Sequence, residues 1–319
     1  MSTTAPPAQS RFQSLMHPTF NLQIAYASAV ILIVSIVGCE LTSVRVPDAG
    51  SAAIGTVLVF AAVLPLLVYL REKGKTYLLD SAQAILWTLF LYGILHFPVV
   101  VAARLGMRTS LQDAHLAAWD QSVGVSVPGI AAWASNHWLG IMANKSYDML
   151  FRFMQTSILL PIFTGRVKYT QKFLTANLVA FALGLPLFAL LPAIGPWFGY
   201  QIAATPDQAA CQAAMLLVRR PGPYVFQAAG IICLPSFHVL WAVLCAQALW
   251  GIRLLRIPVA ALTGLIIFST MTTGWHYFCD VLAGIVLAVS AMVITEWLSR
   301  RLAQLSPDTI NMSQPPLPE

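Results

Sequence analysis

The sequence has few charged residues. Only 9% of its 319 residues are Asp, Glu, Lys or Arg, and 58% are hydrophobic, whereas soluble domains average about 25% charged residues. The mean hydropathy is +0.74. This composition excludes an ordinary soluble domain. It predicts an all-α, polytopic membrane helix bundle embedded in the lipid bilayer.

A concentrated basic patch is also missing. The net charge is +6, but the basic residues are scattered between apolar segments, which is typical of topology signals and not of a nucleic-acid site. We therefore expect no nucleic-acid partner, and the sequence does not indicate an oligomeric state.

Cysteine pairs are absent as well. The five cysteines show no Cys-x-x-Cys pair and no metal-ligand spacing, which argues against a zinc module. Cys211 and Cys233 fall in one predicted outer loop and could form a disulfide there. Since a disulfide requires specific geometry that the sequence does not give, the alternative that both remain free stays open. The first 20 residues are polar and rich in Pro, Ser, Thr and Gln, so we expect no cleavable signal peptide.

Long apolar runs make up most of the chain. A spanning helix needs about 20 largely apolar residues, and this template predicts eight spans. They lie at roughly 22–43, 51–70, 78–103, 146–165, 172–193, 236–252, 257–275 and 277–298. The first three form an N-terminal group at 22–103, and we expect residues 1–21 and 299–319 to be disordered.

The basic residues predict the orientation of these spans. With the N-terminus inside, eleven of the eighteen lie in cytoplasmic segments, mostly short loops at span ends, as the positive-inside rule requires. Both termini are therefore expected in the cytoplasm, at a plasma or inner membrane. The eleven are Arg11, Arg71, Lys73, Lys75, Arg166, Lys168, Lys172, Arg253, Arg256, Arg300 and Arg301.

Two predicted outer segments are longer than ordinary connectors. Residues 104–145 mix Leu, Val, Ile and Trp with polar residues, which predicts one or two amphipathic helices, either interfacial or packed on the bundle. Arg104 and Arg108 are expected to be interfacial. Residues 194–234 are rich in Pro and Gly and predict a long irregular loop that serves as a lid or binding loop.

Two polar motifs stand at the ends of apolar segments. They are Pro-Ser-Phe-His at 235–238 and Trp-His-Tyr-Phe-Cys-Asp at 275–280, and two predicted spans separate them. Two consecutive spans cross the membrane in opposite directions and return the chain to the same face. His238 and His276 are therefore expected to meet on the outer or periplasmic side. Ionisable groups at the ends of spans are costly and tend to be functional.

The residue types in these motifs suit proton transfer and nucleophilic attack. Asp280 follows His276 by four residues at the start of a predicted helix and is expected to accept a hydrogen bond from one imidazole nitrogen. The other nitrogen then becomes a base or a nucleophile. His238 is placed to protonate a leaving group. Ser236 is expected to cap its helix, whose first N–H groups point at a bound anion.

Plainer interpretations stay open for the same residues. A single histidine at a span end is usually interfacial, and a His-x-x-x-Asp pair is also a structural hydrogen bond. Two histidines and an aspartate form a known metal ligand set, but no fourth ligand lies close in sequence. We therefore expect neither a metal nor another cofactor.

These motifs resemble those of the type 2 phosphatidic acid phosphatase superfamily, and most closely its inositol phosphorylceramide synthase-like branch. The resemblance rests on residues 235–242, on Thr-Gly-Trp-His-Tyr-Phe-Cys-Asp-Val-Leu-Ala-Gly at 273–284, and more weakly on residues 119–124 and Tyr147. It covers roughly residues 110–298, so the segment 104–298 would form a phosphotransferase-type membrane domain.

The resemblance implies a phosphotransfer mechanism. His276 would attack phosphorus and form a phosphohistidine, Asp280 would orient it, and His238 would protonate the departing oxygen. Three positions depart from the common phosphatase pattern. Phe237 replaces a glycine, Thr270 replaces a phosphate-binding arginine, and Ala213 replaces a lysine upstream of Arg220 and Pro221.

Some cation must still neutralise the phosphate. Arg219 and Arg220, in the outer loop before the first motif, are candidates for this role, although they would equally suit contact with anionic headgroups. Arg152 is the third candidate, and its alternative is a structural ion pair with Asp148 four residues earlier.

Three functions follow from these patterns. The first is a lipid phosphotransferase that moves a phospho-alcohol headgroup, for example phosphoinositol, between lipids. The second is a lipid phosphate phosphatase that uses the same histidines with water as acceptor. The third is a non-catalytic membrane protein on the same fold, against which the presence of His238, His276 and Asp280 argues.

Overall fold

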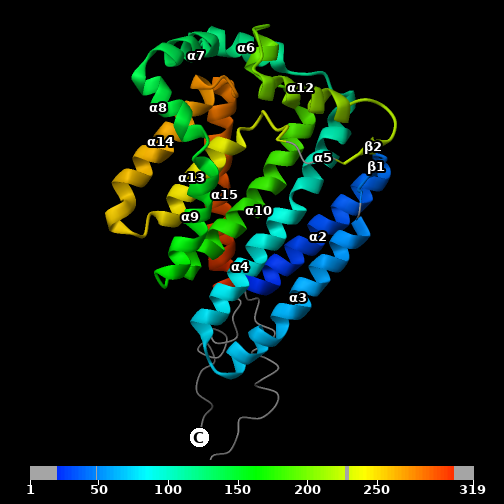
Figure 1. Cartoon of the computed structure of the whole chain (residues 1–319), viewed down its shortest axis with the longest axis vertical. Helices are drawn as coiled ribbons and strands as arrows, with labels where there is room; N and C mark the ends of the chain where they lie inside the picture. Colours follow the sequence, from blue (N-terminus) through cyan, green and yellow to red (C-terminus); the bar gives the residue numbers. More distant parts are fainter. Residues whose placement is uncertain (1–19, 48, 227–229, 305–319) are drawn as a thin grey trace, which may run out of the picture.

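The computed structural model describes residues 20–47, 49–226 and 230–304. Of these described residues, 79% are helical. They form a bundle of long helices, with α6, α7 and α12 lying across one end (Figure 1). The polytopic helical bundle predicted from composition is confirmed. The predicted disorder of residues 1–19 and 305–319 lies outside the described residues.

Within the described residues, six helical segments are long and apolar enough to cross a membrane. They are Gln23–Leu41, Ile54–Glu72, Thr76–Arg108, Val167–Leu190, Arg253–Thr272 and Phe278–Arg301. They belong to α2 (Phe20–Leu41), α3 (Ala49–Glu72), α4 (Thr76–Ile94) with α5 (His96–Leu105) and η1 (Gly106–Arg108), α10 (Val167–Leu190), η2 (Arg253–Leu255) with α14 (Arg256–Thr272), and α15 (Phe278–Gln304).

Two of the eight predicted spans are shorter apolar helices. These are α9 (Leu150–Phe163) and α13 (Phe237–Leu249), with 14 and 13 residues. The prediction of 146–165 as one span was too long, because α8 (Trp138–Tyr147) ends inside it and a turn at residues 148–149 separates α8 from α9. α15 continues to Gln304, so the predicted C-terminal tail begins inside that helix.

Helix α13 is the centre of the bundle. It packs against α9, α10, α14 and α15, and Val239, Leu240, Ala242, Leu244 and Cys245 along it are fully buried. A helix that is apolar on all sides is stable only inside such a bundle. The N-terminal end of α13 carries the first motif, so the bundle core fixes the position of His238.

The first predicted outer segment folds into short helices. They are α6 (Asp113–Ser122), α7 (Val127–Asn136) and α8, and both α7 and α8 pack against α14. Of the two alternatives for residues 104–145, the contacts therefore support helices packed on the bundle.

The prediction of an irregular loop at 194–234 was wrong for much of that segment. It contains α11 (Pro196–Gly199), α12 (Pro206–Val218) and β2 (Tyr224–Val225), which pairs in parallel with β1 (Val44–Arg45). Thr205 caps α12 through a capping box with Gln208, and Pro206 occupies the first helical position. Both features stabilise a helix start.

Arg104 is buried, which corrects the prediction that it is interfacial. Its side chain is only 4% exposed. The guanidinium donates hydrogen bonds to the carbonyl oxygens of Thr42, Val218, Arg220 and Gly222. It therefore joins the end of α2 to the segment after α12. A planar group with five donors suits such a cluster of acceptors.

Candidate active site

The two polar motifs meet where α13 and α15 begin. The backbone N–H of Ser236 donates to the carbonyl oxygen of Asp280 at 3.2 Å, which holds the two helix ends together. The rings of His238 and His276 lie 5.5 Å apart between centroids. The expectation that the two histidines meet at one face of the bundle is therefore met, at a separation within the reach of a single phosphate group.

The helices approach so closely because residue 284 is a glycine. A Cβ atom at Gly284 would lie 2.5 Å from the carbonyl oxygen of Ser236 and 3.0 Å from Cβ of Val239. Any larger residue would push α15 away from α13. Gly284 thus brings the two histidines within reach of each other.

His276 is buried and its Nδ1 atom has two acceptors. Nδ1 lies 3.0 Å from the carbonyl oxygen of Cys233 and 3.5 Å from Oδ2 of Asp280. Since the backbone carbonyl oxygen of Cys233 can only accept, Nδ1 carries the proton and Nε2 of the neutral ring keeps a lone pair. The sequence predicted only the carboxylate as partner; the closer one is a backbone carbonyl from the segment that leads into the first motif.

Asp280 lies in the first turn of α15, whereas His276 lies in the turn before it. The prediction that a helix presents both on one face is therefore wrong in detail, although the two side chains do meet. Oδ2 of Asp280 accepts hydrogen bonds from the backbone N–H of Tyr277 at 2.9 Å and from Sγ of Cys233 at 3.0 Å. The first of these is the contact by which a third helical residue caps its own helix.

Two further carboxylates, both from α6, support the start of α15. Asp120 accepts hydrogen bonds from the backbone N–H groups of Phe278 at 2.8 Å and Cys279 at 3.1 Å. Asp113 accepts from the Tyr277 hydroxyl at 3.0 Å and from the backbone N–H groups of Ile194 and Gly195. A helix N-terminus has unpaired N–H groups and a positive dipole end, so carboxylates stabilise it.

Burial shapes the electrostatics of this support. It raises the pKa of the Asp113 and Asp120 carboxyls, against the lowering effect of their hydrogen bonds. Burial, followed by the charge of Asp113, also raises the pKa of the Tyr277 hydroxyl. The hydroxyl of Tyr277 therefore stays protonated, and its acceptors are Oδ1 of Asp113 at 3.0 Å and the carbonyl oxygen of Gly195 at 2.8 Å.

His238 is held by aromatic packing. Its ring stacks on Tyr147 of α8, with centroids 4.5 Å apart and planes at 19°. Tyr147 lies nearly parallel to Trp275, at 6.3 Å and 9°, and the edge of Trp197 meets Trp275 at 5.3 Å. No hydrogen bond to the imidazole of His238 is found among the described residues, so its orientation depends on these rings.

Ser236 caps α13, as predicted. Its hydroxyl oxygen accepts a hydrogen bond from the backbone N–H of Val239 at 3.4 Å. The N–H groups of Phe237 and His238 belong to the first turn, where intrahelical acceptors are lacking. Within the described part of the chain no acceptor is recorded for either amide. These two N–H groups are available to an anion beside the histidines.

The three predicted phosphate-binding arginines differ in their contacts. The guanidinium of Arg219 donates to the carbonyl oxygens of Gly106, at 2.6 Å, and Thr109, so it is occupied by backbone groups. Arg220 and Arg152 are exposed. Where the structure describes both side chains, no ion pair joins Arg152 to Asp148, so the structural alternative proposed for that pair is not observed.

The cysteines are all free, so the possibility of a disulfide between Cys211 and Cys233 is not realised. The thiol of Cys211 lies 3.3 Å from the carbonyl oxygen of Gly230. Cys233 instead forms a buried cluster with His276 and Asp280, in which one ligand atom from each lies within 4.8 Å of the others. This cluster has the donor types that bind transition metals.

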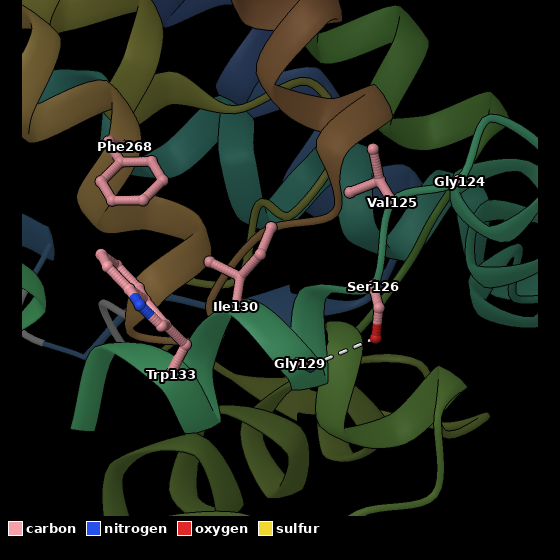
Figure 2. Close-up of a pocket in the computed structure, with 7 residues that line it drawn as sticks. All are labelled: Gly124, Val125, Ser126, Gly129, Ile130, Trp133 and Phe268. Atoms are coloured by element: carbon pink, nitrogen blue, oxygen red, sulfur yellow. Dashed lines mark hydrogen bonds between the residues drawn. The ribbon is translucent and has the colours of Figure 1, made fainter. Parts of the chain in front are cut away.

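A separate hollow lies between α7 and α14 (Figure 2). Its volume is about 540 Å³, and Trp133, Ile130 and Phe268 supply its largest side chains. Ser126 caps α7 at its rim by accepting from the N–H of Gly129 at 3.2 Å. None of the residues that line it is ionisable, so this hollow offers no group for acid–base chemistry.

Several residues of the site escaped the sequence-based prediction. Asp113 and Asp120 are seven residues apart and lie on one face of an amphipathic helix, which is a readable signal. Cys233 and Trp197 lie in the Pro/Gly-rich segment, where no periodic pattern identifies a partner. Asp120 and Tyr147 were noted only as parts of a weak resemblance, and no role was predicted for either.

A protein-family model described as the PAP2 superfamily matches residues 114–294, more than half of the chain. The match runs from α6 into α15 and includes both histidine motifs. Neither the comparison with curated proteins nor that with solved structures returned a match.

Proposed function

The chain belongs to the PAP2 superfamily, whose members are generally phosphatases and phosphotransferases, and we propose that this one is an integral-membrane lipid phosphotransferase. It would move a phospho-alcohol headgroup from one lipid to another through a phosphohistidine on His276. Phosphoinositol is the first headgroup to test, because the motifs resemble the inositol phosphorylceramide synthase-like branch.

The observation that carries this proposal is the environment of His276. Its Nδ1 proton has two acceptors, Cys233 O and Asp280 Oδ2, which leaves the Nε2 lone pair for attack on phosphorus. The second imidazole, of His238, lies 5.5 Å away between ring centroids. A nucleophile, its orienting acceptors and an acid are thus available within one small site.

The reaction proceeds in two balanced steps. In the first, Nε2 of His276 forms a bond to phosphorus as the bond to the diacylglycerol-type leaving oxygen breaks, and protonated His238 gives that oxygen its proton. In the second, neutral His238 takes the proton of an acceptor hydroxyl. The new oxygen–phosphorus bond forms as the nitrogen–phosphorus bond breaks, which regenerates His276.

The phosphate would be bound by backbone and side-chain donors together. The N–H groups of Phe237 and His238, at the start of the 13-residue α13, suit an anion. We assign the neutralising charge to Arg152 and Arg220, because the Arg219 guanidinium is occupied by carbonyl oxygens. Their positively charged donors would stabilise the charge that develops on the equatorial oxygens.

The distribution of basic residues favours an outer or periplasmic location for this site. With both termini in the cytoplasm, the segments with the most Lys and Arg per residue adjoin the inner ends of the spans. Lipid donor and acceptor would then both be drawn from the outer leaflet.

The residue at position 270 favours transfer over hydrolysis. Thr270 stands where phosphatases of the family carry a phosphate-binding arginine. It is fully buried, and its carbonyl oxygen accepts from the backbone N–H groups of Trp275 and His276, both at 3.0 Å. A site without that arginine is less suited to a free phosphate monoester and better suited to a phosphodiester, which carries one negative charge fewer.

Thin-layer chromatography with radiolabelled phospholipids and a panel of lipid alcohols tests the proposal. We expect label to appear in a new lipid, and the His276→Ala variant to be inactive. Release of water-soluble phosphate without a new lipid would favour the phosphatase alternative. Full activity of His276→Ala in both assays would exclude the mechanism.

A further inference from the structure

One cluster in the site has donors that phosphotransfer does not require. Sγ of Cys233 lies 3.0 Å from Oδ2 of Asp280, and Nδ1 of His276 lies 3.5 Å from the same oxygen. One thiol, one imidazole and one carboxylate, all buried, thus converge within 4.8 Å. Phosphohistidine chemistry uses the imidazole and the carboxylate, but it has no use for a thiol at this position.

We infer that Cys233, His276 and Asp280 form an inhibitory binding site for a borderline-soft divalent cation of the Zn²⁺ type. Thiolate, imidazole and carboxylate are the three ligand types that Zn²⁺ prefers. With zinc–ligand distances of about 2.0–2.3 Å and tetrahedral angles, neighbouring ligand atoms are roughly 3.6 Å apart. The two separations above come close to that value, so small side-chain movements complete the site. Three protein ligands leave a fourth position for water or an anion.

Metal binding at Nδ1 inactivates the nucleophile through its tautomer. A neutral imidazole carries one proton, and in the metal-free site that proton is on Nδ1, between Cys233 O and Asp280. A metal ion takes the Nδ1 lone pair, so the remaining ring proton must reside on Nε2. The thiol of Cys233 releases its proton to solvent. Nε2 then has no lone pair with which to attack phosphorus.

The same three donors bind hard cations poorly. Mg²⁺ and Ca²⁺ require six or more oxygen ligands, whereas this cluster offers one carboxylate, one nitrogen and one sulfur. We therefore expect Zn²⁺, Co²⁺ and Cd²⁺ to bind and millimolar Mg²⁺ to have no effect. The inhibitory consequence rests on the proposed function, but the metal site itself does not.

The first experiment measures metal binding alone, without substrate. Purified full-length protein is titrated with Co²⁺, and the thiolate-to-cobalt charge-transfer band and the visible bands of tetrahedral Co²⁺ are recorded. We expect one equivalent to bind with both signals in the wild-type protein and in Cys211→Ser, and neither signal in Cys233→Ser. Absence of the charge-transfer band in the wild-type protein, or its presence in Cys233→Ser, would overturn the inference.

A second measurement does not depend on the folding of any variant. X-ray absorption on the Zn²⁺-loaded wild-type protein should give one sulfur ligand at about 2.3 Å together with lighter ligands at about 2.0–2.2 Å. A zinc environment without sulfur would equally overturn the site.

The third experiment measures inhibition. Zn²⁺ should abolish the transfer activity of the wild-type protein and of Cys211→Ser. For the activity that Cys233→Ser retains, the half-inhibitory concentration should rise at least about tenfold, since even the loss of an outer-shell partner costs that much affinity. Spectroscopic binding with no effect on activity would leave the site standing and contradict the inhibitory role. If the wild-type protein shows neither the charge-transfer band nor the visible Co²⁺ bands but has normal transfer activity, the metal site is refuted and the proposed function stays intact.

Discussion

Replacing Gly284 by alanine tests how closely activity depends on the contact between α13 and α15. The added Cβ would meet the Ser236 carbonyl oxygen at 2.5 Å, about 0.9 Å closer than an ordinary contact at 3.4 Å. Neither helix can adjust easily, because the Ser236 oxygen is a backbone atom and Val239 also lies 3.0 Å from the added Cβ. The helices must therefore separate by most of that distance.

The separation acts directly on the catalytic geometry. His238 is carried by α13 and Asp280 by α15, and a functional site tolerates displacements of only about 0.5 Å. A misplacement of about 1 Å can cost roughly 100-fold in rate, so we expect kcat to fall about 10- to 100-fold in Gly284→Ala. The assay is lipid transfer in detergent micelles, with a thermal melt recorded on the same preparation.

Gly264→Ala is the matched control. Gly264 lies in α14, and a Cβ atom there would meet nothing within 4 Å. Alanine is the better helix former by about 1 kcal/mol, so this variant should retain full activity with equal or higher thermal stability. If Gly284→Ala kept wild-type activity and melting temperature, the tight contact between the helices would not be what sets the separation of the histidines.

Three further predictions concern residues around the site. Tyr147→Leu should lower kcat about tenfold because His238 loses the ring that orients it, at a cost of roughly 0.5–1.5 kcal/mol, while Tyr147→Phe should stay within about twofold; equal rates for both variants would contradict the stacking role. Arg104→Ala should lower the free energy of unfolding by about 3 kcal/mol or more, since four carbonyl oxygens lose their donor, whereas exposed Arg108→Ala should melt as the wild-type protein does; no difference in melting temperature would refute it. Burial raises the pKa of the Cys233 thiol well above its usual value. Above a pH of about 8.5, the thiol pKa in the unfolded chain, the unfolded chain loses this proton while the folded protein keeps it. The stability contributed by this thiol therefore falls as the pH rises past the unfolded-state pKa. Iodoacetamide at pH 7 to 9 should therefore leave Cys233 unmodified in peptide mass spectra until the protein is unfolded, and modification of the native protein that rises with pH would contradict this.

The parts of the fold that the sequence predicted share one physical cause. Apolar runs of about 20 residues have few stable conformations other than bilayer-spanning helices, so the order of the helices, and six of the eight predicted spans, follow from hydropathy. The meeting of His238 and His276 follows in turn, because two intervening helices return the chain to the same face. Neither inference needs a side-chain contact.

The parts that were missed depend on contacts between distant segments. In the sequence, Arg104 is simply a cation at the end of a predicted span. Only the folded structure shows the backbone carbonyl oxygens that accept its hydrogen bonds. Cys233 lies 43 residues before His276, in a segment without periodicity, so nothing in the sequence links its carbonyl oxygen to the imidazole. Helix α12 is a different case, because the Thr205–Gln208 capping box was readable and the Pro/Gly content around it obscured the helix.

The proposed mechanism requires a covalent intermediate at His276, and rapid-quench trapping measures that intermediate directly. The purified protein is mixed with phospholipid carrying a ³²P headgroup, quenched in alkali within the first turnover, and digested for peptide mapping. We expect an alkali-stable, acid-labile label on the peptide that contains His276. The label should be absent from His276→Ala and should accumulate when the acceptor lipid is withheld. Turnover without labelled protein, or the same label in His276→Ala, would contradict the mechanism.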